Sequence, residues 1–287
     1  MVSEVLALLM PSRGGTFVDC TVGLGGHARA VLEAGATRVI GLDRDPEAVR
    51  RAGAALEAFG PLAEVVHADY RRMGDVLDAR QVRSVEGVLL DLGVSSMQLD
   101  AAGRGFSFQR DEVLDMRMDT SAGPTAAQML ADADEKTLAD VIYEFGEERY
   151  ARRIARAIVA ARATAPIETT GRLADITRRA VPRRGYTRID PATRTFQAVR
   201  IWVNRELDGL DLFLREAVQR LAAGGRIAVL SFHSLEDRIV KHTFRALQAE
   251  LPPLVRVLTK RPAVPTEAEV SRNPRARSAK LRGAEAA

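Results

Sequence analysis

Several kinds of chemistry are excluded by what this sequence has little of. It contains one cysteine, Cys20, among its 287 residues, so an internal disulfide and a zinc site built from cysteines are both excluded. The four histidines, His27, His67, His233 and His242, show no H-x-x-x-H spacing, and we expect no resident metal. No apolar run approaches the roughly 20 residues of a membrane-spanning helix. The first residues also show no basic leader or cleavage site, which favours a cytoplasmic protein.

Charge is distributed unevenly along the chain, although the net charge is only +4. Residues 149–205 contain fourteen arginines, no lysine and three acidic residues, which gives this segment +11 and leaves −7 for the remainder. A basic block inside an otherwise acidic chain indicates a partner that carries phosphates, such as a nucleic acid. The alternative explanation is an arginine-rich composition of the whole protein.

The first third of the sequence alternates short apolar segments with helical patterns. This alternation is typical of a parallel sheet that is covered by helices on both faces. The four expected strands are residues 16–20, 38–43, 63–67 and 87–91. Asp45 and Pro46 mark the start of one helix, as its N-cap and as a first-turn residue.

A long interruption follows the fourth strand. The next clear strand, residues 225–231, begins about 135 residues later, whereas a strand–helix–strand step takes about 30. The intervening segment shows helical patterns and no clear strand. We therefore expect a doubly wound, Rossmann-like α/β sheet formed by residues 1–94 and 206–287, with an inserted all-helical domain, residues 95–205. Strands at 255–259 and 279–282 should complete the sheet, and a helix is expected at 237–250.

Two helices of the inserted segment bear on its function. In residues 149–162, the arginines Arg152, Arg153 and Arg156 share one face opposite an apolar face. A second helix is expected over residues 195–214.

Acidic residues and glycines gather where the expected strands end. Each of the four strands ends in an acid or is followed closely by one, and these acids are Asp19, Asp43, Asp69 and Asp91. Gly23 and Gly25 form a turn after the first strand, where glycine lets a ligand approach the backbone and the next helix offers free N–H groups. An acid after the second strand is placed to bind a ribose. A nucleoside-containing cofactor is therefore expected over the first two strands.

Two cofactors fit this pattern. Gly23, Gly25 and Ala28 match the dinucleotide motif G-x-G-x-x-A, with Asp43 near the expected distance. However, Asp19 directly precedes the turn, where a carboxylate repels a pyrophosphate but suits the charged amino-acid end of S-adenosylmethionine. Because another acid follows the fourth strand, we favour S-adenosylmethionine over a nicotinamide dinucleotide.

Motifs along nearly the whole chain resemble those of the bacterial small-subunit ribosomal RNA methyltransferase H family. They are DCTVGLGGH at 19–27, DLGVSSMQLD at 91–100, RGFSF at 104–108, LDMRMD at 114–119, GEER at 146–149, PATRTFQAVR at 191–200, SFHSLEDR at 231–238 and NPRARS at 273–278. The resemblance implies a class I methyltransferase sheet. It also implies methylation of the exocyclic N4 of one cytidine, cytidine 1402, in the decoding centre of 16S ribosomal RNA.

The resemblance and the strand-end pattern together give the expected site. The cofactor-binding residues are Asp19, Gly23, Gly25, Gly26, His27, Asp43, Asp69, Tyr70, Asp91 and Gln98, and the catalytic candidates are Asp91, Ser95 and Ser96. For the RNA substrate we expect Arg152, Arg153, Arg156, Arg194, Arg200, Asn204 and His233. Tyr70 stands where the family commonly has phenylalanine, and its ring can still stack on adenine.

Other roles stay open at this point. His233 is as well explained by a structural role, and Asp91 by cofactor binding alone. The alternative functions are a nicotinamide-dependent oxidoreductase and a non-catalytic RNA-binding factor of ribosome assembly. The expected partner is 16S ribosomal RNA within the small ribosomal subunit, with no membrane; the sequence decides neither a homodimer nor a magnesium ion bound between RNA and aspartates.

Overall fold

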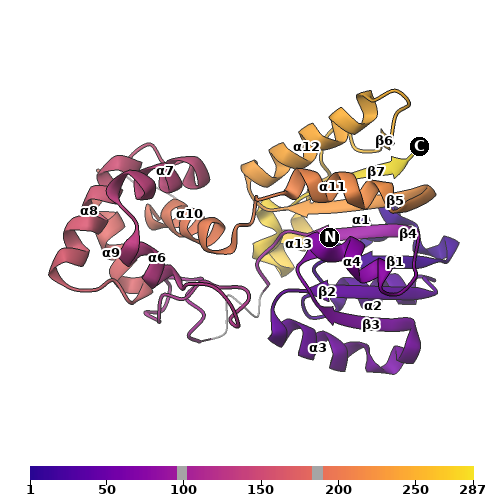
Figure 1. The fold of residues 1–287 in the computed structure, drawn as a ribbon, viewed down its shortest axis with the longest axis horizontal. Helices are drawn as coiled ribbons and strands as arrows, with labels where there is room; N and C mark the ends of the chain where they lie inside the picture. The colour runs from indigo at the N-terminus through magenta and orange to yellow at the C-terminus, as the bar shows by residue number, and fades with distance from the viewer. Residues whose placement is uncertain (96–101, 183–189) are drawn as a thin grey trace. The chain divides into compact units, whose positions relative to one another are not determined.

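Seven strands form a single mixed sheet (Figure 1). Their bounds are β1 Thr16–Asp19, β2 Arg38–Asp43, β3 Ala63–His67, β4 Val85–Asp91, β5 Leu221–Ser231, β6 Val255–Val257 and β7 Lys280–Ala286. The order across the sheet is β3-β2-β1-β4-β5-β7-β6. The strands from β3 to β5 pair in parallel, and β7 runs antiparallel to both β5 and β6. The predicted doubly wound α/β sheet is confirmed.

The computed structural model describes residues 1–95, 102–182 and 190–287. The chain divides into two units, the sheet unit Met1–Gly93 with Gly209–Ala287, and the helical unit Val94–Asp208. The helices of the sheet unit are α1 Val2–Leu9, α2 Gly26–Glu33, α3 Pro46–Leu56, α4 Met73–Asp78, α11 Leu210–Gln219, α12 Ser234–Ala249 and α13 Glu267–Arg272. As predicted, Asp45 caps α3 by accepting a hydrogen bond from the Glu47 N–H at 3.1 Å.

Helices cover both faces of the sheet. Successive residues of a strand point to opposite faces, so Phe17 packs with residues of α1, α2 and α3, while Val18 packs with residues of α4, α11 and α12. In β2, Val39 packs on the same face as Phe17, and Ile40 packs on the same face as Val18. The sheet is therefore the middle of three layers, which explains why its strands read as continuous apolar runs.

The strand order reverses beside β1, which pairs with β2 on one side and β4 on the other. Asp19, the last residue of β1, lies opposite Gly41 of β2 and Leu89 of β4. Asp43 and Asp91 therefore both lie two residues beyond Asp19, on either side of it. In open α/β sheets, ligands bind at the carboxyl ends of the strands at such a reversal.

The helical unit has a core of its own, made by α6 Ala126–Asp132, α7 Glu135–Gly146, α8 Ala151–Thr164, α9 Thr170–Ala180 and α10 Ala192–Asn204. Phe108 packs edge-on against Phe196 in this core, with ring centroids 4.8 Å apart. The predicted arginine helix corresponds to α8.

The prediction of one helix over residues 195–214 is wrong. The segment forms two helices, α10 and α11, because the chain turns between them. Arg205 adopts a left-handed conformation with φ of 50°, and Gly209 does so with φ of 64°. The apolar pattern continues through this turn, which is why periodicity alone did not reveal it.

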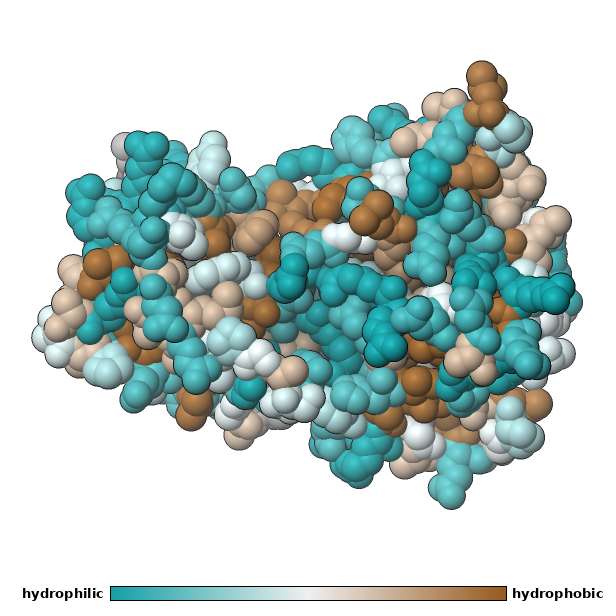
Figure 2. Space-filling model, viewed as in Figure 1, coloured by the Kyte–Doolittle hydropathy of each residue, from teal (hydrophilic) through white to brown (hydrophobic). Residues whose placement is uncertain are grey.

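Hydrophilic side chains cover most of the face drawn in Figure 2, and hydrophobic ones are scattered over it. Among the described residues, no helix is both long enough and apolar enough to cross a membrane.

Gly41 provides a test of how the glycine turn is packed. A Cβ atom at this position would lie 2.7 Å from Cγ2 of Val22, in the turn that follows β1. We predict that Gly41→Ala lowers the free energy of unfolding by about 1–3 kcal/mol, measured by urea denaturation, and that adding Val22→Ala recovers part of the loss. As a control, Gly53→Ala in α3, where nothing lies within 4 Å of the new atom, should stabilise by up to about 1 kcal/mol. Equal stability of Gly41→Ala and the parent would contradict this packing.

Candidate active site

Asp19 is the most buried of the acidic residues at the strand ends, with 3% of its surface exposed. Its Oδ1 accepts a hydrogen bond from the Thr21 N–H at 3.3 Å. Its Oδ2 is buried and has no hydrogen-bond partner among the described residues. A buried acceptor without a donor is costly, so this oxygen marks a place where a ligand with donors or positive charge is favoured.

Asp43 holds the glycine turn from the neighbouring strand. Its Oδ2 accepts the N–H of Gly23 at 2.9 Å, and its Oδ1 accepts the N–H of Asp45 at 2.9 Å. Each carboxylate oxygen has two lone pairs, so both oxygens can accept a further hydrogen bond. The carboxylate is therefore fixed in position and still able to accept hydrogen bonds from two ribose hydroxyls.

Asp91 is tied to the end of β1 through a residue that sequence reasoning missed. The Thr21 hydroxyl accepts a hydrogen bond from the Asp91 N–H at 2.7 Å, and the Gly93 N–H donates to Oδ1 of Asp91 at 3.1 Å. The position of Thr21 beside Asp19 in the turn motif was the only signal in the sequence that could have indicated this role.

The turn leads into α2 with its N-terminal N–H groups uncapped by a side chain. Gly23 and Gly25 have φ of 54° and 81°, the left-handed region that glycine enters without strain. A Cβ atom at Gly26 would meet nothing within 4 Å, so the backbone here is open to a ligand. His27 follows, with its Nε2 3.7 Å from Oδ2 of Asp91.

The pKa values of the three carboxylates are raised, and burial is the main cause. Burial raises the pKa of Asp19 to about 7, and the negative charges of Asp91 and Asp43 add to the effect. Burial also raises the pKa values of Asp43 and Asp91. Burial lowers the pKa of His27, so the ring is neutral at pH 7. A buried carboxylate flanked by two others of raised pKa favours a positively charged ligand.

Two predicted cofactor residues lie in a different setting. Asp69 follows β3, and its carboxylate accepts the Arg71 N–H and pairs with the guanidinium groups of Arg71 and Arg44. The Tyr70 ring is buried and packs edge-on against Phe213 of α11 at 4.7 Å. Adenine stacking by Tyr70 and cofactor binding by Asp69 stay predictions.

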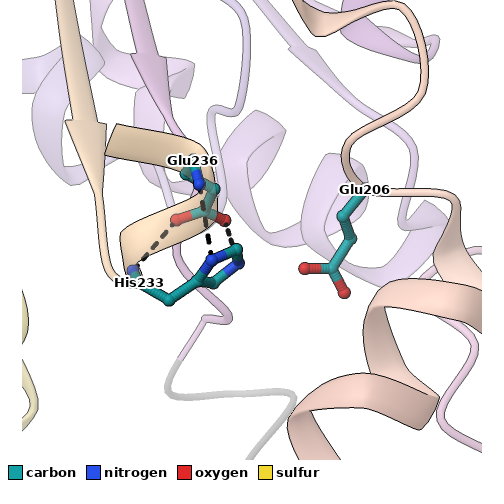
Figure 3. Close-up of side chains that lie close together, drawn as sticks. All are labelled: Glu206, His233 and Glu236. Carbon is teal, nitrogen blue, oxygen red and sulfur yellow. Dashed lines mark hydrogen bonds and ion pairs between the residues drawn. The ribbon is translucent and has the colours of Figure 1, made fainter. Parts of the chain in front are cut away.

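His233 caps α12, as Figure 3 shows. The Glu236 N–H approaches Nδ1 of His233 at 3.4 Å, and Oε2 of Glu236 accepts the N–H groups of Phe232 and His233 at 2.8 and 3.3 Å. Only 8% of the His233 side chain is exposed. These contacts support the structural role for His233 rather than direct contact with RNA.

The predicted RNA-binding residues of the helical unit fall into two groups. Arg152, Arg153 and Arg156 are exposed on α8, and Arg156 lies 3.6 Å from Glu135. Arg194, also exposed, lies near Glu148 at 3.7 Å. The exposed guanidinium groups of α8 are therefore available to phosphates.

Arg200 and Asn204 instead serve the helical unit itself. Arg200 pairs with Glu206 through two hydrogen bonds of 2.9 and 2.7 Å, and only 18% of its side chain is exposed. Asn204 is buried, donates to the carbonyls of Met116 and Arg200, and accepts the Met118 N–H. The polar groups of these two residues are already bonded within the helical unit, and their expected RNA contacts stay predictions.

Ser95 is described by the structure and is half-buried. The other two predicted residues of this segment, Ser96 and Gln98, lie outside the described residues.

The strand order, the antiparallel β7 and the acids at the ends of β1, β2 and β4 together define a Rossmann-like fold of the class I methyltransferase type. Comparison with known proteins agrees. The sequence model of the MraW methylase family matches residues 1–287, and the chain belongs to this family; it is a methyltransferase.

Curated relatives match over nearly their whole length. They carry the name ribosomal RNA small subunit methyltransferase H, and three of them follow as examples. The protein of Nitrobacter winogradskyi is 50% identical, covering 98% of this chain and 88% of its own. The protein of Pelobacter propionicus is 50% identical, and the match covers 99% of this chain and 96% of the relative. The protein of Syntrophotalea carbinolica is 51% identical, and the match covers 98% of this chain and 95% of the relative.

The burial of Asp19 predicts a pH dependence of stability in the ligand-free protein. The folded pKa of about 7 lies above the unfolded value of 3.8, so between these values the folded state binds a proton that the unfolded state lacks. This stabilisation is present at about pH 4 and is lost as the pH rises through 7. We predict that Asp19→Asn matches the parent near pH 4 and becomes the more stable of the two above pH 7, by at most about 4 kcal/mol.

Urea denaturation from pH 4 to 8 measures the difference. The exposed acid Asp75 on α4 provides the control. The difference in free energy of unfolding between Asp75→Asn and the parent should not rise between pH 4 and 8 as it does for Asp19→Asn. A difference between Asp19→Asn and the parent that stays constant with pH would show that the carboxyl is ionised throughout.

Proposed function

We propose that this protein transfers the methyl group of S-adenosylmethionine to the exocyclic N4 of cytidine 1402 in 16S ribosomal RNA. The observation that carries the proposal is the group of Asp19, Asp43 and Asp91 around the glycine turn, with one buried carboxylate oxygen left without a donor. The names of the relatives support RNA of the small ribosomal subunit as the substrate.

The residues present fit this cofactor. Asp19 offers its free oxygen and negative charge to the α-ammonium group, and the open backbone at Gly26 leaves room for close approach. Asp43 offers hydrogen-bond acceptors to the ribose. A pyrophosphate in the same place would face the buried Asp19 carboxylate, which argues against a nicotinamide dinucleotide.

When bound, S-adenosylmethionine supplies an electrophilic methyl group on a sulfonium. The protein must bring the amine of the base to about 3–3.5 Å from that methyl in line with the breaking bond. The amine is a weak nucleophile because its lone pair is delocalised into the ring, so acceptors for its hydrogens favour the reaction. Asp91, at the end of β4 with 27% of its side chain exposed, provides such an acceptor.

Transfer of radiolabelled methyl to three preparations tests the function. These are small ribosomal subunits, naked 16S RNA and a reaction without RNA, with the product nucleoside identified by mass spectrometry. We expect N4-methylcytidine at one position and only with RNA present. RNA binding without transfer would instead identify an assembly factor, and binding of NADH in preference to S-adenosylmethionine would identify an oxidoreductase.

Asp43 should contribute strongly to cofactor affinity. We predict that Asp43→Ala weakens S-adenosylmethionine binding by about 10–100-fold, because hydrogen bonds to a charged group contribute about 1.5–3 kcal/mol. Asp43→Asn retains one acceptor and should fall between this variant and the parent. Calorimetry measures the affinity, and thermal unfolding verifies that the turn held by Asp43 still folds. Unchanged affinity in Asp43→Ala would remove Asp43 from the ribose site.

The arginines of α8 should contribute to RNA affinity and not to cofactor affinity. We predict that Arg152→Gln, Arg153→Gln and Arg156→Gln together weaken RNA binding by roughly tenfold or more. They should also reduce the slope of log affinity against log salt by up to about 2, as about 0.7 is lost per contact with single-stranded phosphate. Cofactor affinity should not change.

A matched triple variant makes the same charge change on the sheet unit. It replaces Arg50, Arg51 and Arg72, which pair with acids of their own surface, by glutamine. Equal loss of RNA affinity in both triple variants would show that net charge, and not the α8 face, is responsible.

A further inference from the structure

His27 and Asp91 form a pair at the site whose chemistry the strand-end pattern did not explain. His27 belongs to the first turn of α2, and Asp91 is the last residue of β4. Nε2 of His27 lies 3.7 Å from Oδ2 of Asp91. The ring keeps 20% of its side-chain surface exposed and the carboxylate 27%, so the pair is enclosed by protein yet open on one side.

The two oxygens of Asp91 have different surroundings. Oδ1 accepts the N–H of Gly93 at 3.1 Å, while Oδ2 faces the His27 ring. The backbone on either side of the carboxylate is fixed by the Thr21 hydroxyl and by pairing of Leu92 with Leu230. The carboxylate is thus held at a defined place, with one oxygen directed at a ring nitrogen that is just beyond hydrogen-bond distance.

The other ring nitrogen of His27, Nδ1, differs from Nε2 in its surroundings. Nδ1 is buried and without a hydrogen-bond partner among the described residues. A histidine whose only function was to pack α2 against the sheet would bond this nitrogen. Among the described residues, the Asp91 carboxylate lies 3.7 Å from the ring at Nε2, so the ring is placed to act on that carboxylate.

Other charged groups act on the pair, and their signs oppose one another. His27 faces Asp91, the Met1 ammonium and Glu269 of α13. Asp91 faces His27, Glu236 of α12, the Met1 ammonium and, across β1, Asp19. Burial together with the acids Glu236 and Asp19 favours the protonated form of Asp91. Among the described groups, the His27 ring, the Gly93 N–H and the Met1 ammonium favour the ionised form of Asp91; a neutral ring does so through its N–H dipole.

We propose, on the basis of the function above, that Asp91 accepts the proton released by the methylated amine and that His27 is the positioning residue that keeps Asp91 oriented and ionised. The nitrogen–carbon bond forms as the sulfur–carbon bond breaks, with the electron pair of that bond going to sulfur. The positively charged N4 then releases one proton to the Asp91 carboxylate, which passes it to water. Neutral His27 directs its Nε2–H at Oδ2 and stabilises the charged form of the carboxylate.

Three variants separate orientation of Asp91 from packing of the ring. His27→Phe keeps an aromatic ring without a donor, His27→Gln retains an N–H donor, and His242→Phe changes an exposed histidine on α12 as the control. Single-turnover methyl transfer is measured from pH 5.5 to 9, and S-adenosylmethionine affinity is measured at pH 8 by calorimetry.

We expect His27→Phe to lower the maximal rate by roughly tenfold or more and to move the acidic limb of the pH–rate profile to higher pH. His27→Gln should recover most of both changes, and His242→Phe should match the parent. Cofactor affinity at pH 8 should stay within about twofold in His242→Phe, and in His27→Phe any loss of affinity should be smaller than the loss of rate. Titration of the ¹³C-labelled Asp91 carboxyl by NMR, which needs no substrate, should show a higher pKa in His27→Phe than in the parent.

Each contrary result overturns a part of the proposal. An unmoved acidic limb and an unmoved Asp91 titration in His27→Phe would show that the ring does not act on Asp91. A rate loss matched by an equal loss of cofactor affinity would make His27 a cofactor-binding residue, and failure of His27→Gln to recover would exclude the donor role. A parent protein that methylates no RNA overturns the proposed function, whereas the NMR titration still decides the coupling of the two residues.

Discussion

Three carboxylates that repel one another are held together because β1 pairs in register with a strand on each side. Asp19 lies opposite Gly41 and Leu89, which carries Asp43 and Asp91 two residues beyond it. The backbone of Asp43 and of Asp91 cannot move away from Asp19 unless the parallel pairing at the centre of the sheet breaks. The sheet therefore stabilises an arrangement of charge that is unfavourable by itself, and a cationic ligand relieves it.

The same register determines how the backbone of the turn is shaped. Gly41 leaves space for Val22, the Asp43 carboxylate holds the Gly23 N–H, and the Thr21 hydroxyl holds the Asp91 N–H. Each of these contacts joins the turn after β1 to a neighbouring strand. The binding loop is thus part of the sheet rather than an appendage of it, and its glycines place free N–H groups at the start of α2 without strain.

The arginines of the helical unit differ in their exposure and pairing. Arg200 near the end of α10 is paired with Glu206, and Asn204 bonds the backbone of the segment around Met116. The arginines of α8 stay exposed. Because a paired, mostly buried guanidinium has already lost its hydration to a carboxylate, it gains little from a phosphate. The charge of a segment is therefore a poor guide to which of its arginines bind a partner.

The sequence by itself determined the strands, the three-layer sheet, the glycine turn and the acids at the strand ends, because alternation of apolar runs and turn residues is a local property. It also indicated the α8 arginine face. It did not predict the break between α10 and α11, since Arg205 carries no local mark of its left-handed conformation and the apolar pattern continues past it. Only the tertiary structure decided which polar groups are already bonded, as with Arg200 and Asn204, and which have no hydrogen-bond partner among the described residues, as with Oδ2 of Asp19. It also decided that Thr21 links two strands and that His27 faces Asp91. The contacts of Asn204 with Met116, of Thr21 with Asp91 and of His27 with Asp91 join residues about 60 to 90 positions apart, and contacts over such separations depend on the packing of the whole sheet or bundle rather than on nearby sequence.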